Sequence, residues 1–145
     1  MGELPRSIES YRGAAQLARE IGDPELLARA AIGLEEACRR GLIVGDEVVE
    51  LLEEASAAVG PGDTQLRVQV LGALARAPAF RGNAERGSVV GANAVAMARR
   101  LGDRRSLALA LFSSYWARGG MPSERVAALL DERDQPLSAG EREAL

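Results

Sequence analysis

The sequence predicts an all-α protein, organised as a right-handed α-solenoid of about three to four helix-turn-helix repeats. Three observations lead to this fold class. A stretch of sequence returns eighty residues after its first occurrence, and a Gly-Asp pair recurs every forty residues. Apolar residues are spaced three and four positions apart, as on amphipathic helices, and do not alternate as they do in strands.

The repeat is visible as two similar stretches, IGDPELLARAAIGL at 21–34 and LGDRRSLALALFSS at 101–114. An alignment of residues 14–34 with 94–114 matches eight identical residues, and it pairs Leu17 with Met97 and Ile21 with Leu101 conservatively. The pairs Gly22-Asp23, Gly62-Asp63 and Gly102-Asp103 then follow one another at a period of forty. A period of this size is typical of helical repeats with two helices each.

Each Gly-Asp pair has a mechanical explanation as the turn between two helices. Glycine adopts the left-handed conformation that often ends a helix, and the aspartate side chain can cap the next helix by accepting backbone N–H bonds. Pro24 after Asp23 suits a first helical position. We therefore predict tight hairpins with left-handed Gly22 and Gly102 and with Asp23 and Asp103 as caps. The middle copy, GPGD, has a looser turn.

The helices are predicted from apolar periodicity between stretches rich in glycine and proline. One domain covers 1–145, with repeats at about 6–41, 45–80 and 84–120 and a partial repeat at 121–145. The predicted helices span residues 6–20, 24–39, 46–59, 64–77, 84–101, 104–118, 123–132 and 139–144.

The composition excludes several kinds of chemistry. The chain has no histidine and one cysteine, which removes the commonest general base, the usual metal ligand and every Ser-His or Cys-His pair. We therefore expect no metal site, no cofactor and no catalytic activity. Adjacent Glu35 and Glu36 point about 100° apart on a helix, so they are expected to lie on a solvated face, paired with Arg39 and Arg40 four residues on.

Charge and hydropathy indicate a cytoplasmic protein that does not bind nucleic acid through this segment. The net charge is −3, all 18 basic residues are arginine, and the arginines alternate with acids instead of forming a basic face. No stretch has the length and apolarity of a membrane span. The single cysteine, Cys38, lies in a helical run and is expected to be a buried thiol in a reducing compartment.

The stretch SLALALFSSYWARGG at 106–120 is apolar almost all the way round, which is typical of a helix buried on several sides. Its aromatic residues have two interpretations: packing against the predicted helix at 123–132, or a recognition surface, since Trp and Tyr are frequent interface anchors. Asn93 could line the same region. The candidate ligand- or partner-binding residues are Arg12, Gln16, Asn93, Phe112, Tyr115 and Trp116.

Two stretches, ARRLGDRRSLALALFSSYWARGGMPSERVAAL at 98–129 and AREIGDPELLARAAIGL at 18–34, carry a family resemblance that extends over most of residues 14–130. They resemble the tetratricopeptide-like repeat regions of large multidomain transcriptional regulators from GC-rich bacteria. Those regulators carry an N-terminal P-loop ATPase, and many end in a LuxR-type helix-turn-helix, while others are coupled to cyclase or activator domains. The period of forty departs from the 34 residues of a standard tetratricopeptide repeat.

The chain contains no Walker motif and no recognisable DNA-reading helix, so the ATPase and DNA-binding activities of that family do not carry over. The resemblance implies the middle module, a non-catalytic scaffold that senses an effector or binds a protein partner or other domains of the same polypeptide. The alternative is a free-standing protein that binds a small molecule, as sequestering or resistance proteins do. We also expect apolar surface at the ends of the array and a weak two-fold homodimer, with Trp116 the first residue to probe.

Overall fold

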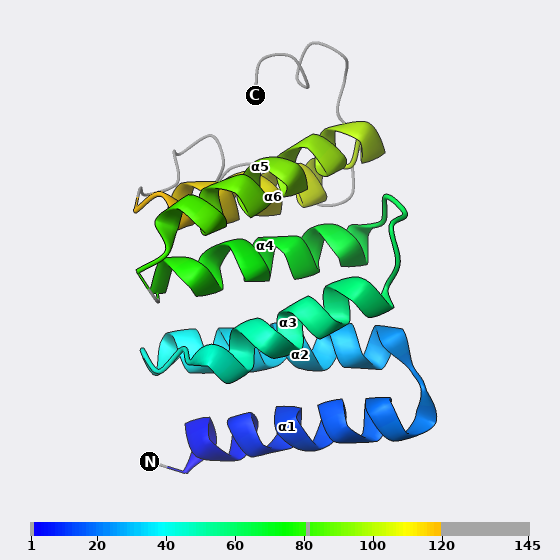
Figure 1. Ribbon diagram of the computed structural model, residues 1–145, viewed down its shortest axis with the longest axis vertical. Helices are drawn as coiled ribbons and strands as arrows, with labels where there is room; N and C mark the ends of the chain where they lie inside the picture. Colours follow the sequence, from blue (N-terminus) through cyan, green and yellow to red (C-terminus); the bar gives the residue numbers. More distant parts are fainter. Residues whose placement is uncertain (1, 81, 120–145) are drawn as a thin grey trace.

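The computed structural model describes residues 2–80 and 82–119, and every regular element within them is an α-helix (Figure 1). The all-α prediction is therefore confirmed for this part of the chain. The predicted helices 123–132 and 139–144, with the partial repeat 121–145, lie outside the described residues. The described helices are α1 (Glu3–Ile21), α2 (Pro24–Arg40), α3 (Asp46–Ala58), α4 (Gln65–Phe80), α5 (Ala84–Leu101) and α6 (Arg104–Ala117).

The helices form a stack that follows the order of the sequence (Figure 1). α2 packs against α1, α3 and α4, and α4 packs against α2, α3, α5 and α6. The main packed pairs are neighbours or next neighbours along the chain, and α1 at one end is far from α5 and α6 at the other. Any site built across the stack must therefore come from helices that are neighbours or next neighbours along the chain.

The first and third predicted hairpins have the expected turns. Gly22 ends α1 with φ 69° and Gly102 ends α5 with φ 67°, both in the left-handed region. The side chain of Asp23 accepts a hydrogen bond from the Leu26 backbone N–H, and that of Asp103 accepts one from the Ser106 backbone N–H. These turns make α1–α2 and α5–α6 compact hairpins, as the repeat predicts.

The middle turn differs from the other two. Gly60, with φ 77°, takes the left-handed conformation there, and the Thr64 hydroxyl caps α4 by accepting from the Arg67 N–H. The carboxylate of Asp63 instead accepts two hydrogen bonds from Arg100 on α5. The six residues between α3 and α4 make this loop too long for the two-residue joint, which frees the aspartate from capping.

Two helices extend three residues beyond their predicted ends, and a proline lies in each added stretch. α1 begins at Glu3 and includes Pro5 in its first turn, where backbone N–H groups have no intrahelical partner. α4 continues through Pro78 to Phe80, although its end was predicted at residue 77. The Pro78 carbonyl is satisfied by the Asn83 backbone N–H at 2.8 Å.

Among the described residues, the core consists of two apolar clusters that meet at α4. One includes Leu34 and Leu52 and lies among α1 to α4, and the other includes Met97 and Leu107 and lies among α4 to α6. Glycine allows the second cluster to close tightly, since a Cβ at Gly87 would lie 2.5 Å from the Ala75 carbonyl oxygen. Within the described ranges, no helix combines the length and apolarity that crossing a membrane requires.

Candidate interaction surface

The six predicted binding residues occupy two separate regions of the stack. Arg12 and Gln16 lie on α1, whereas Asn93 lies on α5 and the three aromatic residues lie on α6. Because α1 packs against neither α5 nor α6, the six cannot form one site. The α1 residues line a groove against α3, and the α6 residues lie at the opposite end of the described stack (Figure 1).

Two bidentate ion pairs between α1 and α3, which we call braces, bound the α1–α3 groove at its ends. The Arg12 guanidinium donates to both carboxylate oxygens of Glu47, at 2.8 and 2.9 Å. The Arg19 guanidinium binds Glu54 in the same bidentate way, at 2.9 and 2.6 Å. Each brace joins residues 35 positions apart, and the two braces stand two helical turns apart on both helices. Together they connect α1 to α3, which are not one of the main packed helix pairs.

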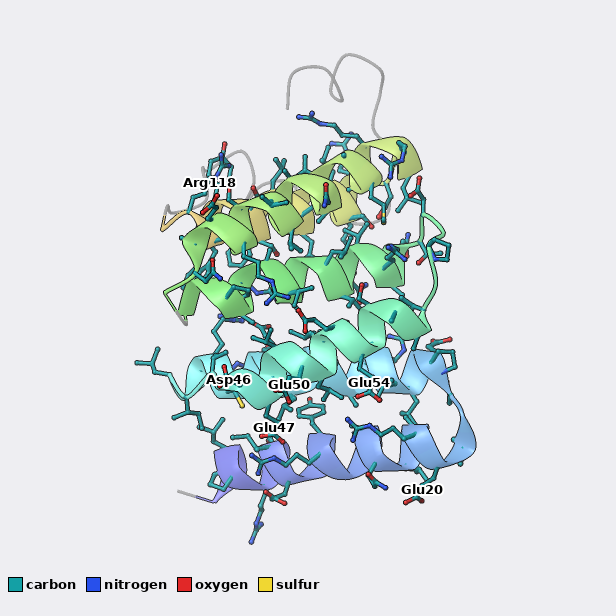
Figure 2. All side chains as sticks on the ribbon, in the orientation of Figure 1. Glu20, Asp46, Glu47, Glu50, Glu54 and Arg118 are labelled. Carbon is teal, nitrogen blue, oxygen red and sulfur yellow. The ribbon has the colours of Figure 1, made fainter. Side chains whose placement is uncertain are left out.

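Between the braces lies a hollow of about 360 Å³ with a small apolar floor formed by Ala15 and Leu51. Gln16 lines it and donates its side-chain amide to Glu20 at 3.0 Å. Glu50 projects from α3 between Glu47 and Glu54 (Figure 2). Within residues 2–80 and 82–119, no hydrogen bond or ion pair reaches the Glu50 carboxylate, so its charge is available in the groove.

The two braces shift the pKa values of the arginines and glutamates that form them. Hydrogen bonds from Arg12 hold the pKa of Glu47 below its ordinary value, and those from Arg19 do the same to the pKa of Glu54. The pKa of each arginine is raised in turn by the hydrogen bond to its glutamate. The groove therefore carries paired charges at its two ends and the carboxylate of Glu50 in its middle.

Sequence reasoning missed the α3 side of this groove. The signal was present, because Arg12 and Arg19 are seven residues apart, as are Glu47 and Glu54, at one constant offset. Residues seven apart lie on the same face of a helix, so two such pairs at equal separation predict facing rows of charge.

The aromatic residues of α6 are engaged largely with the protein itself. The rings of Phe112 and Trp116 stack with centroids 6.1 Å apart, and the Arg39 guanidinium of α2 lies 5.8 Å from the Trp116 ring. Tyr115 is more exposed and has the Arg118 guanidinium 5.2 Å from its ring. The helix is buried on several sides, as predicted, with Leu107, Ala110 and Ser113 among its buried residues. Packing against residues 123–132 lies outside the described part of the chain.

Asn93 is exposed on α5. That helix packs through buried small residues, including Gly91, where a Cβ would lie 3.1 Å from the Ser114 Cα. The side of α5 that meets α6 is therefore the glycine and alanine side. The suggestion that Asn93 lines the aromatic region gains no support from this geometry.

A buried polar network connects α2, α4 and α6 and corrects one expectation. Glu35 was expected on a solvated face, yet it is fully buried. Its carboxylate accepts two hydrogen bonds from Arg76, at 3.2 and 2.8 Å, and lies 3.3 Å from the Arg39 Nε. Arg76 also donates to the Ser113 hydroxyl at 2.6 Å. The expected pairing of Glu35 with Arg39 and of Glu36 with Arg40 is confirmed, but the position of Glu35 was wrong because α4 covers it.

Within the described ranges, no cluster of three or more acidic or cysteine side chains has the geometry to hold a metal ion. The Cys38 thiol is buried, as expected, and burial raises its pKa. Comparisons of the chain with protein-family models, curated proteins and solved structures find no match. The residues and their geometry therefore provide the basis for a functional proposal.

Proposed function

We propose that this protein is a non-catalytic helical-repeat interaction module, which binds a protein partner along the groove between α1 and α3. We further propose that it serves as the tetratricopeptide-like sensor or relay region of a cytoplasmic multidomain regulator, in line with the family resemblance. In this proposal the partner is a protein segment or another domain of the same polypeptide, and the module supplies a rigid docking surface.

The observation that supports the proposal is the spacing of the contacts that hold the stack together. Bidentate pairs join residues 35 positions apart at Arg12–Glu47 and 37 apart at Asp63–Arg100. The buried pair Glu35–Arg76 spans 41 positions. All three separations are close to the forty-residue period, which is expected if each repeat is fastened mainly to its neighbour, as in a solenoid.

Such an array presents a continuous surface along its helices, which suits an extended or helical partner segment. In the α1–α3 groove both arginines are already paired, and Glu50 carries the available charge. The partner segment that fits best therefore brings a lysine or arginine to Glu50 and a small apolar side chain to the floor at Ala15 and Leu51. The small-molecule alternative is weaker, because Phe112 and Trp116 stack on each other.

The proposal is tested first by the coding sequence on both sides of this segment. The expected result is an in-frame P-loop ATPase upstream and a helix-turn-helix or other output domain downstream. The neighbouring domains are then expressed separately and titrated into the ¹⁵N-labelled chain. Backbone amide shifts should change along α1 and α3, around Gln16 and Glu50.

The variant Glu50→Gln should weaken that binding, while the matched Glu25→Gln, on the exposed side of α2, should not. Glu25 is paired with Arg29, and neither residue lines the groove, so Glu25 controls for the loss of one surface carboxylate. Equal affinity of both variants and unperturbed α1 and α3 amides would contradict the proposed groove. Saturable binding of a small metabolite with shifts confined to α6 would favour the alternative.

A further inference from the structure

The outer face of α1 carries a regular stripe of exposed residues. Its positions alternate in steps of three and four, which places them on one side of the helix. Leu17 is 49% exposed, and Ile21, four residues further on, is 60% exposed. The stripe consists of Glu3, Arg6, Ser10, Gly13, Leu17 and Glu20, all of them exposed.

The internal repeat shows what this kind of face does elsewhere in the chain. The counterpart of Leu17 is Met97 of α5, which is only 6% exposed and belongs to the buried cluster of α4, α5 and α6. The counterpart of Ile21 is Leu101, which packs against the same cluster. The two apolar positions that α5 packs against neighbouring helices are therefore bare on α1, whereas Arg86, Asn93 and Arg100, the counterparts of the other α1 residues Arg6, Gly13 and Glu20, are exposed on α5 as well.

We propose that this face binds α1 of a second copy of the chain, in an antiparallel pair related by a two-fold axis at Gly13. A two-fold contact must be self-complementary, because the same patch serves both partners. Arg6 and Glu20 each lie seven residues from Gly13, on opposite sides, about 10.5 Å along the axis. An antiparallel pair centred there brings Arg6 of each copy to the Glu20 of the other.

The charges concerned are available for this contact. Neither Arg6 nor Glu20 takes part in an ion pair within residues 2–80 and 82–119, and Glu20 only accepts a hydrogen bond from Gln16. Gly13 suits the crossing point, since no atom lies within 4 Å of a Cβ placed there and the backbones can approach closely. The arrangement thus forms two new ion pairs without breaking any within a copy.

The face also has a shallow hollow on one side of Gly13 and protruding apolar residues on the other. A hollow of about 480 Å³ lies on α1 before Gly13, lined by Glu3, Arg6, Ser7, Ser10 and Tyr11. The protruding Leu17 and Ile21 lie after Gly13 on the same helix. The two-fold axis places the protruding pair of each copy over the hollow of the other. This contact is independent of the proposed partner groove, which lies on the α3 side of α1.

The test is sedimentation velocity of the purified chain over a concentration series, with circular dichroism to verify that each variant is folded. Reversing one charge, Arg6→Glu or Glu20→Arg, places like charges together twice, so the dimer dissociation constant should rise by roughly tenfold. The double variant Arg6→Glu/Glu20→Arg should restore the wild-type value to within about threefold. Leu17→Gln should abolish dimerisation, and Arg29→Glu, on α2, is the control expected to leave it unchanged.

Restoration of dimerisation by the double reversal would establish the α1 pair, because residues that do not meet cannot compensate for each other. A chain that stays monomeric at millimolar concentration would overturn the proposal. So would a dimer that is indifferent to all three α1 changes. In the latter case, weakening by Trp116→Ala would place the contact at the α6 end of the stack instead.

Discussion

The carboxylate of Glu35 and the guanidinium of Arg76, 41 residues apart, form a bidentate pair that is almost completely shielded from water. Removing one member of such a pair leaves the other charge buried without compensation, which costs about 3–5 kcal/mol. We therefore expect Glu35→Ala to lower the free energy of unfolding by several kcal/mol in urea titrations. The exposed pair Arg19–Glu54 is the matched comparison, and Glu54→Gln should cost about 0.5 kcal/mol or less.

The double variant Glu35→Leu/Arg76→Met separates electrostatic from packing effects at the same place. Replacement of both charges by apolar side chains of similar size is often neutral or stabilising. We expect the double variant to be clearly more stable than Glu35→Ala alone. A double variant as unstable as the single one would mean that the shape of the pair matters more than its charge, contrary to our interpretation.

The helix cap at Asp103 should be worth about 1 kcal/mol, since its side chain accepts the Ser106 N–H at 2.8 Å. Asp103→Ala should lower the thermal midpoint accordingly, whereas Asp63→Ala, which removes no cap, should have a smaller effect. Gly102→Val should be worse than Asp103→Ala, because a β-branched residue is disfavoured at φ 67°. Thermal melts in which Gly102→Val is neutral would refute the assigned turn.

Leu42 has φ 55° in the loop between α2 and α3, the only residue other than glycine with positive φ among those described. Gly82, forty positions later in the corresponding loop, has φ 78°. The Leu42 side chain is 79% exposed and gains little by burial, while left-handed backbone costs a non-glycine residue about 1–2 kcal/mol. Leu42→Gly should raise the thermal midpoint slightly, and a marked fall would indicate that the leucine has a stabilising contact.

The close contact of α5 with α4 should make Gly87 intolerant of any side chain. A Cβ there would lie 2.5 Å from a backbone oxygen, which cannot move aside cheaply, so Gly87→Ala should destabilise the chain by about 1–3 kcal/mol. Gly13→Ala provides the contrast within an exposed helix, with open space around the new methyl group, and should stabilise α1 by up to about 1 kcal/mol. Urea titration at low protein concentration measures both.

The ion pairs Arg12–Glu47 and Arg19–Glu54 predict that the protein loses stability in acid. The folded pKa values of Glu47 and Glu54 lie below the ordinary 4.5, so their contribution to stability is fully present above about pH 4.5. It is lost as the pH falls through the lowered folded values, where the carboxylates become protonated. Arg12→Gln/Arg19→Gln should therefore flatten the fall of the thermal midpoint below pH 4.5, and Arg29→Gln should not.

The sequence alone was sufficient for the local features of this fold. Helix type follows from apolar spacing, and the turns at Gly22-Asp23 and Gly102-Asp103 follow from the backbone freedom of glycine and the short polar side chain of aspartate. Helix type and turn conformation both depend on residues that are close together in the chain, so they can be predicted from a single sequence. The repeat alignment likewise indicated which helices pair into hairpins. The middle Gly-Asp pair lies in a longer loop, as the looser turn expected there predicted.

The tertiary structure alone decided which charged residues are buried and which residues face one another. Glu35 and Glu36 are neighbours with the same side chain, yet Glu35 is fully buried and Glu36 remains partly accessible. The difference arises because α4 brings Arg76 to one of them, a contact across 41 residues that no local pattern encodes. The separation of Arg12 and Gln16 from the α6 aromatic residues has the same origin, since the order of helices in the stack sets which faces can meet.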